Sequence, residues 1–298
     1  MKLHVCLLYP GGPTEEKTID SFLDEQIHDP FVQETLPSFF RSLWIWILLY
    51  FRKKTPLLEG PCHSFLHAQE HVQELNRLLG PDFVCHAIHH FGKANMDSVI
   101  KSIPNKSHVV LVPLMPHRCQ TLYSAQGSLR SQLQKKHCQV TEIGHYATKE
   151  PFVQALCTQI RKAIISSNSP KYGLLFLEQR QPEKWNKSSE EYKTDIQKTV
   201  STVMSALQTN QPHLIVHTHS VDWNQAMEQW KKQAVSTVIT IPTSWVVHSE
   251  LLRVEQQRIE KNITELGLTC SHASPIQSQP FDQFLVETIR SIFERVQK

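Results

Sequence analysis

Glycine is scarce in this sequence, which contains 9 glycines in 298 residues. That share, about 3%, is less than half of the usual share of about 7%. Collagen repeats, Gly/Ser linkers and glycine-rich phosphate loops are therefore excluded. Histidine, by contrast, is abundant, at 17 residues.

A strong charge of either sign is also lacking, because 31 Lys and Arg stand against 28 Asp and Glu, for a formal net charge of +3. The sequence shows no basic stripe, so we do not expect a nucleic-acid partner. Hydrophobic residues make up 40% of the chain and charged residues 20%, which excludes a disordered chain. The length allows one large or two ordinary domains.

The seven cysteines are odd in number and lack Cys-x-x-Cys spacing. Cys6 and Cys85 sit inside apolar runs, which is typical of reduced core residues in a cytosolic protein. The opening segment 2–9 is too short for a secretory signal and stops at Pro10. We therefore expect a cytoplasmic protein.

Short apolar runs alternate with helical patterns along the chain. The expected strands occupy 3–9, 83–88, 109–114, 139–143, 173–177, 214–217, 238–241 and 268–271. Windows with helical periodicity occupy 14–27, 31–50, 63–79, 93–103, 122–136, 148–167, 187–208, 223–233, 248–266 and 279–297. Because strands rich in Val, Ile and Leu are each followed by a helix, we expect parallel sheets covered on both faces.

The polar stretch 166–171 is the best linker candidate and divides the chain into two α/β lobes of similar plan, 1–165 and 171–298. Each lobe is expected to be Rossmann-like, with a four-stranded parallel sheet flanked by helices. Ligands of such sheets bind beyond the carboxyl ends of the strands. The loops that follow strands are therefore the first place to look for functional residues.

The aromatic segment 39–51 departs from this plan, because it is apolar on nearly every face and is followed by Arg52-Lys53-Lys54. Its uninterrupted apolar run of about nine residues is well short of the roughly 20 that span a bilayer. Three interpretations stay open: a buried helix, a lip helix over an apolar ligand mouth, or an interfacial membrane anchor.

Several motifs occur in an order that resembles the ferrochelatase family. They are Tyr9-Pro10-Gly11-Gly12-Pro13 after the first strand, His28-Asp29-Pro30, Thr35-Leu36-Pro37, the basic stretch 52–56, and the strand 109–116 followed by His117. The resemblance covers nearly the whole length. It implies two lobes with a ligand cleft between them, a lip helix at about 38–52, and a last helix that packs back on the body.

The same resemblance implies insertion of Fe²⁺ into a porphyrin, with the metal as substrate and no resident cofactor. Porphyrin or haem is then the expected ligand, a divalent metal the second partner, and the lip helix a point of peripheral membrane contact. The substrate-binding residues implied in this way are Pro10, Gly11, Gly12, Trp44, Trp46, His117 and Trp245.

The family's catalytic histidine motif follows the first strand of the second lobe, where this chain reads Leu177-Glu178-Gln179-Arg180-Gln181-Pro182. The proline matches, but Gln179 stands at the histidine position. A glutamine amide cannot take up and release a proton near neutral pH, whereas an imidazole can.

A second family motif, Val-Pro, an aromatic residue and His-x-Glu, resembles the segment 241–252 if one residue is deleted before His248. The resemblance makes Glu250 the catalytic acid opposite Gln179 and His248 its neighbour. Glu255 and Glu260 follow on the same expected helix and, with Glu250, form a plausible carboxylate track for a divalent cation. The alternative is a plain helix start, with Ser249 as cap and Glu250 favoured by the helix dipole.

The surplus histidines fall into groups. His63, His67 and His71 lie on one helix face, either as an exposed polar face or as accessory metal or haem ligands. His86, His89 and His90 lie at the end of the second expected strand, which makes His89 and His90 candidate metal ligands. His217 and His219 follow a second-lobe strand in the same way.

Two functions follow. One is a working ferrochelatase in which Glu250 and a nearby histidine take the place of the missing base. The other is a catalytically inactive homologue that binds haem or porphyrin as a sensor, carrier or regulator.

Overall fold

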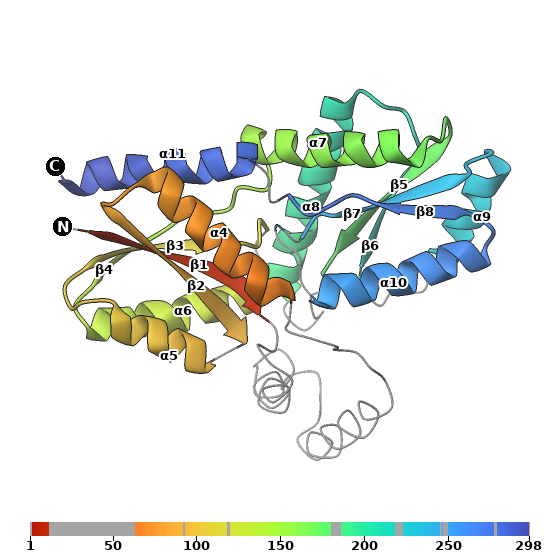
Figure 1. Ribbon diagram of the computed structural model, residues 1–298. Helices are drawn as coiled ribbons and strands as arrows, with labels where there is room; N and C mark the ends of the chain where they lie inside the picture. Colours follow the sequence, from red (N-terminus) through yellow and green to blue (C-terminus); the bar gives the residue numbers. More distant parts are fainter. Residues whose placement is uncertain are drawn as a thin grey trace, which may run out of the picture. The chain divides into compact units, whose positions relative to one another are not determined.

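Two parallel four-stranded sheets with flanking helices make up the described structure, a computed structural model (Figure 1). The structure describes residues 2–11, 63–91, 93–117, 120–179, 186–217, 223–244, 246, 250–276 and 279–297. The expected α/β fold is confirmed, and every expected strand overlaps an observed one. The expected helices at 14–27 and 31–50, including the aromatic segment, lie outside the described residues.

The first sheet has the strand order β2-β1-β3-β4 and is parallel throughout. Its strands are β1 (Leu3–Gly11), β2 (Phe83–Phe91), β3 (His108–Pro113) and β4 (Gln139–Glu142). The accompanying helices are α4 (His63–Leu79), α5 (Lys93–Ser102) and α6 (Gln120–Lys135).

The second sheet repeats this order as β6-β5-β7-β8, again parallel. Its strands are β5 (Tyr172–Glu178), β6 (His213–His217), β7 (Thr237–Pro242) and β8 (Thr269–His272). Its helices are α7 (Glu150–Ser167), α8 (Asn186–Leu207), α9 (Asn224–Lys232), α10 (Glu250–Glu265) and α11 (Gln279–Gln297).

Contacts divide the chain into two compact units. Unit 1 comprises Met1–Leu114, Cys119–Gly144 and Phe293–Lys298, and unit 2 comprises Met115–Arg118 and His145–Ile292. Helix α7 therefore belongs to unit 2, where it contacts α8, β7 and β8. The division into two α/β lobes, 1–165 and 171–298, stays a prediction.

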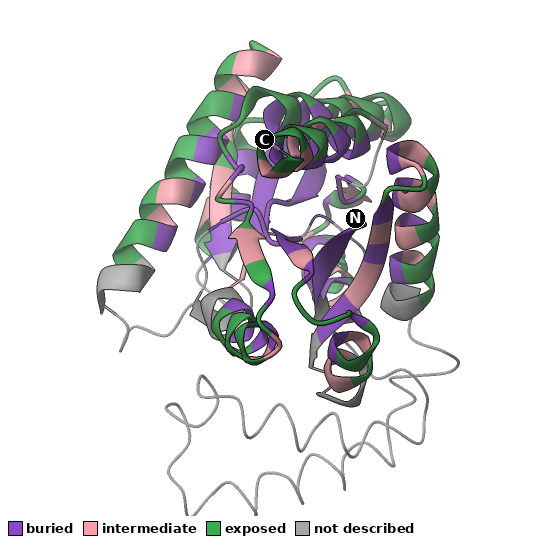
Figure 2. Cartoon of the chain, turned by 90° about the vertical axis from the view of Figure 1, so that its left-hand side faces the viewer, coloured by how far each residue is buried: buried purple, intermediate pink, exposed green. Residues whose placement is uncertain are grey.

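The central strands are buried on both faces because they are apolar at nearly every position, whereas the polar edge strands β4 and β8 are partly exposed. Leu3, Val5 and Leu7 of β1 and the Val109–Val112 run of β3 are fully buried. Figure 2 shows the strands mostly purple or pink and the outward faces of the helices green. This continuous apolar pattern, without alternation, is what a parallel sheet covered on both sides requires.

In unit 2, Gly173 makes room for a tryptophan. A Cβ atom at Gly173 of β5 would collide with the indole ring of Trp230 in α9. Trp230 is buried in the cluster that also holds Leu175, Val238 and Ile259. The missing side chain of Gly173 therefore lets α9 seat its largest residue against the sheet.

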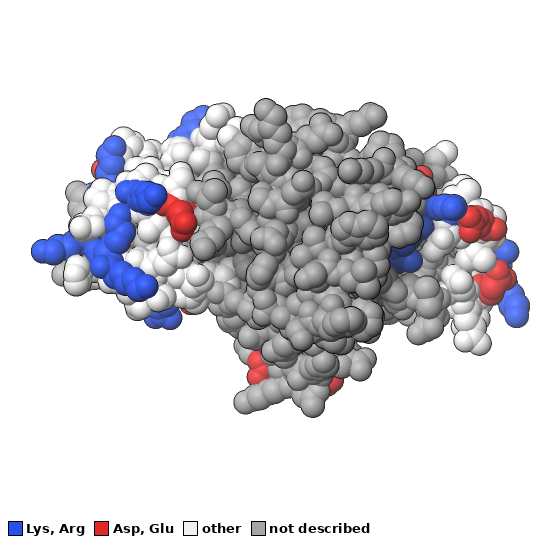
Figure 3. Space-filling view, turned by 90° about the horizontal axis from the view of Figure 1, so that it is seen from below, with Lys and Arg blue, Asp and Glu red and all other residues white. Residues whose placement is uncertain are grey.

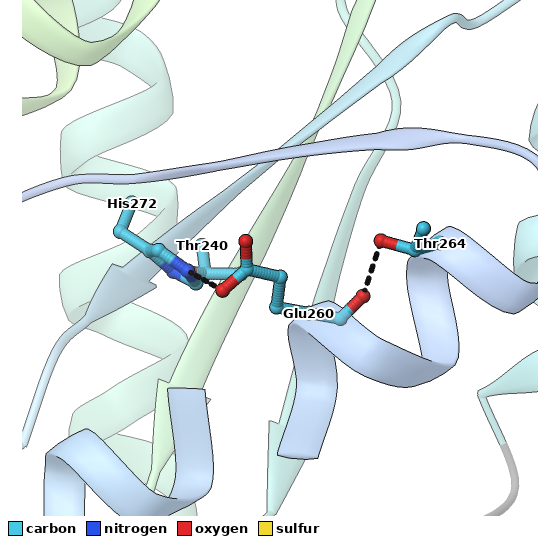
Figure 4. Close-up of polar contacts among 4 residues, drawn as sticks. All are labelled: Thr240, Glu260, Thr264 and His272. Carbon is cyan, nitrogen blue, oxygen red and sulfur yellow. Dashed lines mark hydrogen bonds and ion pairs between the residues drawn. The ribbon is translucent and has the colours of Figure 1, made fainter. Parts of the chain in front are cut away.

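A histidine joins β7, β8 and α10 (Figure 4). His272 Nδ1 lies 2.6 Å from Thr240 Oγ1 on the neighbouring strand, and His272 Nε2 lies 3.3 Å from a carboxylate oxygen of Glu260. Thr264 donates its hydroxyl to the backbone oxygen of Glu260. The sheet edge is thereby tied to the helix that begins with Glu250.

A second histidine contact joins β1 and β2 in unit 1. His4 Nδ1 and His86 Nε2 are 3.0 Å apart, and the two rings stack with centroids 5.3 Å apart. Burial, with a smaller effect from His4, lowers the pKa of His86 from its ordinary 6.5 to about 4. The pKa of His4 is lowered by burial and by the charges of Lys2 and Lys136.

Several helices are followed by a residue that is not glycine but has a left-handed backbone conformation. Helices α6, α7, α8 and α9 are followed by His137, Asn168, Gln208 and Ala234, all with positive φ, whereas Gly80 and Gly267 follow α4 and α10. Glycine is the usual residue at such positions. The low glycine content therefore shows directly in the helix ends.

Among the described residues, no helix is both long enough and apolar enough to cross a membrane. Lys and Arg lie on the same face as Asp and Glu in Figure 3, as the small net charge implies.

Replacing Gly173 with alanine is expected to lower the free energy of unfolding by about 1–3 kcal/mol, because the new methyl group overpacks the Trp230 site. Gly127→Ala is the matched control, since a Cβ atom at Gly127 in α6 meets no atom within 4 Å. That variant should be stabilised by about 0.5–1 kcal/mol. Urea denaturation measures both, and an unchanged Gly173→Ala variant would contradict the packing argument.

Acid should destabilise the fold through His86. Its pKa is about 4 when folded and about 6.5 when unfolded, so the unfolded chain takes up the proton first. The contribution is intact above about pH 6.5, declines as the pH falls, and is fully lost below about pH 4. Within this window the slope is at most about 1.4 kcal/mol per pH unit for one proton.

Denaturant titrations of the wild type and of His86→Leu between pH 7 and pH 4 test this. The variant should show a shallower pH dependence by up to one proton. Equal slopes in the two proteins would refute the assignment.

Candidate functional site

Polar side chains gather where β5 and β7 end. In the order β6-β5-β7-β8, the chain leaves β5 to one side for β6 and returns to the other side for β7. The carboxyl ends of β5 and β7 therefore form the topological switch point of this sheet. Ligands of open parallel sheets bind at such a point.

Gln179 follows the last residue of β5 and is half-buried. Its backbone N–H donates to Ser244 Oγ at 3.3 Å, and Ser244 Oγ lies 2.8 Å from the hydroxyl of Tyr192 in α8. Thr243 donates its backbone N–H and its hydroxyl to the backbone oxygen of Leu177. The segment after β7 is thus fastened to the end of β5, which fixes the backbone at Gln179.

His117 is 1% exposed. Its Nε2 lies 3.1 Å from Thr199 Oγ1 in α8, and the Thr199 hydroxyl also lies within hydrogen-bonding distance of two backbone oxygens, Asp195 O at 2.9 Å and Ala147 O at 3.4 Å. His117 Nδ1 is buried and has no hydrogen-bond partner.

Burial lowers the pKa of His117 to about 3, with a smaller contribution from His145. The ring is therefore neutral at physiological pH. A neutral imidazole with a lone pair in an apolar setting is a good nitrogen ligand. It is a poor general base, because an effective base has a pKa near the working pH.

Tyr192 connects these two arrangements. Its ring meets that of His117 edge-on, with centroids 6.0 Å apart, while its hydroxyl contacts Ser244. We call His117, Gln179, Tyr192, Thr199 and Ser244 the edge cluster. All five residues belong to unit 2.

In unit 1, His71 and His89 lie near Tyr9 of β1. The Tyr9 hydroxyl is 3.0 Å from His71 Nδ1, and the rings of Tyr9 and His89 are 5.5 Å apart. His71 is buried, so the interpretation of its helix face as wholly exposed is wrong; His67 is partly exposed beside Glu70. Burial lowers the pKa of His89 to about 4. His90 lies in β2, and its side chain is outside the described part.

Two carboxylates of α10, Glu255 and Glu260, already have partners. Glu255 is 2% exposed and accepts two hydrogen bonds from Arg258, at 2.5 and 3.2 Å. Glu260 contacts His272. Glu250 is the first residue of α10, and its side chain is not described. Metal binding at Glu250, Glu255, His89 or His90 stays a prediction, and the described residues contain no group of three or more His, Cys, Asp or Glu that could hold a metal.

Other expected site residues lie at or beyond the limits of the described chain. Pro10 and Gly11 end β1, with side chains not described. The remaining ones lie outside the described residues: Gly12, Trp44, Trp46, Trp245 and His248. Their roles in binding porphyrin or promoting catalysis remain predictions.

Tyr192, Thr199 and Ser244 are candidate functional-site residues that were not predicted from the sequence. Two signals were available. Tyr192 and Thr199 are spaced i, i+7 on one expected helix face, and Ser244 lies in a loop that follows an expected strand.

This chain is similar to known ferrochelatases along most of its length. The profile of the ferrochelatase family matches residues 2–292. The ferrochelatase of Geotalea uraniireducens (strain Rf4) is 23% identical over 297 residues, covering 92% of this chain and 92% of that protein. The ferrochelatase of Campylobacter fetus subsp. fetus (strain 82-40) is 23% identical over 219 residues, covering 70% of this chain and 69% of that protein.

Solved chelatase structures share the fold. The sirohydrochlorin chelatase SirB from Bacillus subtilis subspecies spizizenii, solved in complex with cobalt, has a TM-score of 0.53 at 8% identity, over 96% of this chain and 93% of that one. DR2241 from Deinococcus radiodurans, a multi-domain protein with structural similarity to chelatases, has a TM-score of 0.53 at 12% identity. The match covers 96% of this chain but about half of DR2241, 54%. With a family match from residue 2 to residue 292 and the same two-sheet fold, this chain belongs to the ferrochelatase family.

Proposed function

We propose that this protein inserts Fe²⁺ into a porphyrin, a lyase reaction of haem biosynthesis. The family match over nearly the whole chain supports this. The observation that carries it is the edge cluster, which sets hydrogen-bonding and nitrogen-donor groups at the switch point of the second sheet. The described cysteines are free thiols, which agrees with a cytoplasmic location.

Insertion requires that two pyrrole N–H protons leave the macrocycle as the metal ion enters. We assign the proton acceptor to Glu250, at the start of α10, with His248 beside it. A carboxylate is ionised at neutral pH, and the amino end of a helix favours its charge. The α10–β8 contact between Glu260 and His272 holds this helix against the sheet.

Gln179 does not take part in proton transfer, because an amide has no accessible protonation step. Its position is nevertheless held by a backbone bond, from the Gln179 N–H to Ser244 Oγ. A different side chain at residue 179 therefore keeps the same anchor. The proposal accordingly predicts a slow enzyme in which a histidine introduced at residue 179 could still act as a general base.

Restoring histidine at this position should raise the rate. A positioned general base typically contributes about 10²- to 10⁴-fold, so Gln179→His is expected to increase kcat for Fe²⁺ insertion by about 10-fold or more. Gln179→Asn, which offers no titrating group, is the matched control and should stay at the wild-type rate. The loss of porphyrin absorbance and the growth of metalloporphyrin absorbance measure both, and an unimproved His variant would contradict this role of residue 179.

Removing the carboxylate of Glu250 should abolish most of the activity. Glu250→Gln keeps the size of the side chain but cannot accept a proton, so insertion should slow by about 100-fold or more. Glu265→Gln, on an exposed residue at the other end of α10, should leave the rate unchanged. If the wild type inserts neither Fe²⁺ nor another divalent metal into protoporphyrin or coproporphyrin above background, the proposed function is overturned.

A further inference from the structure

Positive charge is unevenly distributed along the chain. Residues 93–138, which include α5, β3 and α6, hold seven of the 31 Lys and Arg but one of the 28 Asp and Glu. The formal charge of this segment is therefore +6, and because the whole chain carries +3, the rest of the chain carries −3. Although the sequence shows no basic stripe, the fold brings much of this charge together.

The basic residues gather at the amino edge of the first sheet. Lys2 precedes β1, Lys106 precedes β3, and Lys135 and Lys136 precede β4. Because the four strands are parallel, their amino ends lie at the same edge. Lys101 lies there too, since α5 ends just before the loop that leads into β3. We call Lys2, Lys101, Lys106, Lys135 and Lys136 the basic cluster.

Contacts between loops hold the basic cluster together. The Lys106 N–H donates to the backbone oxygen of Lys136 at 3.0 Å. The Lys136 ammonium donates to the backbone oxygen of Ile100, near the end of α5, at 2.7 Å. Burial, and then the charges of Lys2 and Lys136, lower the pKa of His4. The loops before β3 and β4 are therefore joined, and Lys2 lies near them.

Most of the basic cluster is open to an external partner. All of its members except Lys136 are exposed, and within the described part of the chain these four form no ion pair. The acidic residues of the same elements are Asp82 before β2, Asp97 in α5, and Glu142 of β4, whose carboxylate lies 3.6 Å from Arg130. Figure 3 shows mostly blue charged side chains over this end of unit 1, at the left.

The composition of this surface indicates what kind of partner it fits. Stable protein interfaces are built around buried aromatic or apolar anchors, and the exposed large hydrophobic residues of the described chain, Leu66 and Ile165, lie in α4 and α7. Proteins that bind single-stranded nucleic acid stack bases on aromatic side chains, and the segments 101–107 and 134–138 contain no Phe, Tyr or Trp.

Lipid headgroups need no such anchors. A lysine ammonium is a point charge on a flexible stem, which suits an anionic surface whose charges have no fixed pattern. Groups of about four to eight Lys and Arg are the usual means by which proteins recognise anionic lipids. The basic cluster, with five lysines, falls within that range.

We propose that the basic cluster binds the surface of a bilayer that contains anionic phospholipids. Such a surface attracts the segment that carries +6 and repels the rest of the chain, which carries −3, so the amino edge of the first sheet faces the bilayer. The carboxyl ends of β1 to β4, at the opposite edge of that sheet, face away from it. This contact uses none of the residues 38–52 of the expected lip helix, and it does not depend on the proposed function.

Co-sedimentation of the full-length protein with vesicles tests the proposal. Vesicles of phosphatidylcholine and phosphatidylserine in equal amounts should retain the wild type, whereas vesicles of phosphatidylcholine alone should not. The variant Lys101→Gln/Lys106→Gln/Lys135→Gln removes three exposed charges and spares Lys136, which holds the loops together. Its affinity for the anionic vesicles should fall by about 100-fold, at about fivefold for each lysine.

A matched variant separates the position of the charges from the net charge. Lys162→Gln/Lys198→Gln/Lys232→Gln removes the same charge from exposed lysines of unit 2 and should bind the anionic vesicles like the wild type. Thermal unfolding shows that both triple variants are folded. Equal losses of affinity in the two folded variants would overturn the proposal, because the basic cluster would then have no special role.

Two soluble polyanions test the other classes of partner. A DNA duplex represents nucleic acid, and polyglutamate represents an acidic protein. Neither should displace the wild type from the anionic vesicles when the charge concentrations are matched. Displacement by either one, together with its loss of binding to the cluster variant, would assign the surface to that class and overturn the assignment to lipid.

A variant of the aromatic segment separates this contact from the expected lip helix. Trp44→Ala/Trp46→Ala should still bind the anionic vesicles and not the neutral ones. If this variant lost binding while the cluster variant kept it, the membrane contact would belong to the aromatic segment, and the proposal would be wrong.

The insertion assay is read separately, in buffer without vesicles. There the cluster variant should behave like the wild type, because its three lysines lie at the amino edge of the sheet. If the wild type inserts no metal but binds vesicles through the basic cluster, the proposed function fails and the membrane assignment holds. If the wild type inserts metal and phosphatidylserine does not affect its binding, the membrane assignment fails and the proposed function holds.

Discussion

The structure depends on one constraint, that the first strand of each sheet is central and must bond on both edges. In unit 2, β5 pairs with β6 on one side and β7 on the other. A strand in this position is apolar on both faces, and Gly173 is the place where it yields space to Trp230. The chain leaves β5 for β6 on one side and returns to β7 on the other, so β5 ends at the switch point of the sheet. Gln179, the residue after β5, therefore lies at that point.

Much of this arrangement follows from local sequence. The apolar runs of β1, β3, β5 and β7 predict buried parallel strands, and the structure confirms them. The motif comparison also places Gln179 directly after β5. These features are predictable because they depend on residues adjacent in the chain, or on a pattern repeated along it.

The remaining site features depend on contacts between distant segments. In the sequence, His71 belongs to a polar helix face. In the structure it is buried and contacts the hydroxyl of Tyr9, 62 residues earlier in the chain. Thr199 and His117 are 82 residues apart, and neither sequence neighbourhood indicates the other. The spacing of Glu255 on its helix suggests a metal ligand, but in the structure its carboxylate is paired with Arg258.

The scarcity of glycine has a thermodynamic meaning at the helix ends. His137, Asn168, Gln208 and Ala234 adopt a backbone conformation in which a Cβ atom crowds the next carbonyl. The cost is roughly 1–2 kcal/mol per residue, and it is smaller for Asn168 because asparagine adopts this conformation more readily. Four such termini represent stability that the fold leaves unrealised. Thermostabilisation of this chain therefore has a natural starting point in its C-caps, none of which is a residue of the edge cluster.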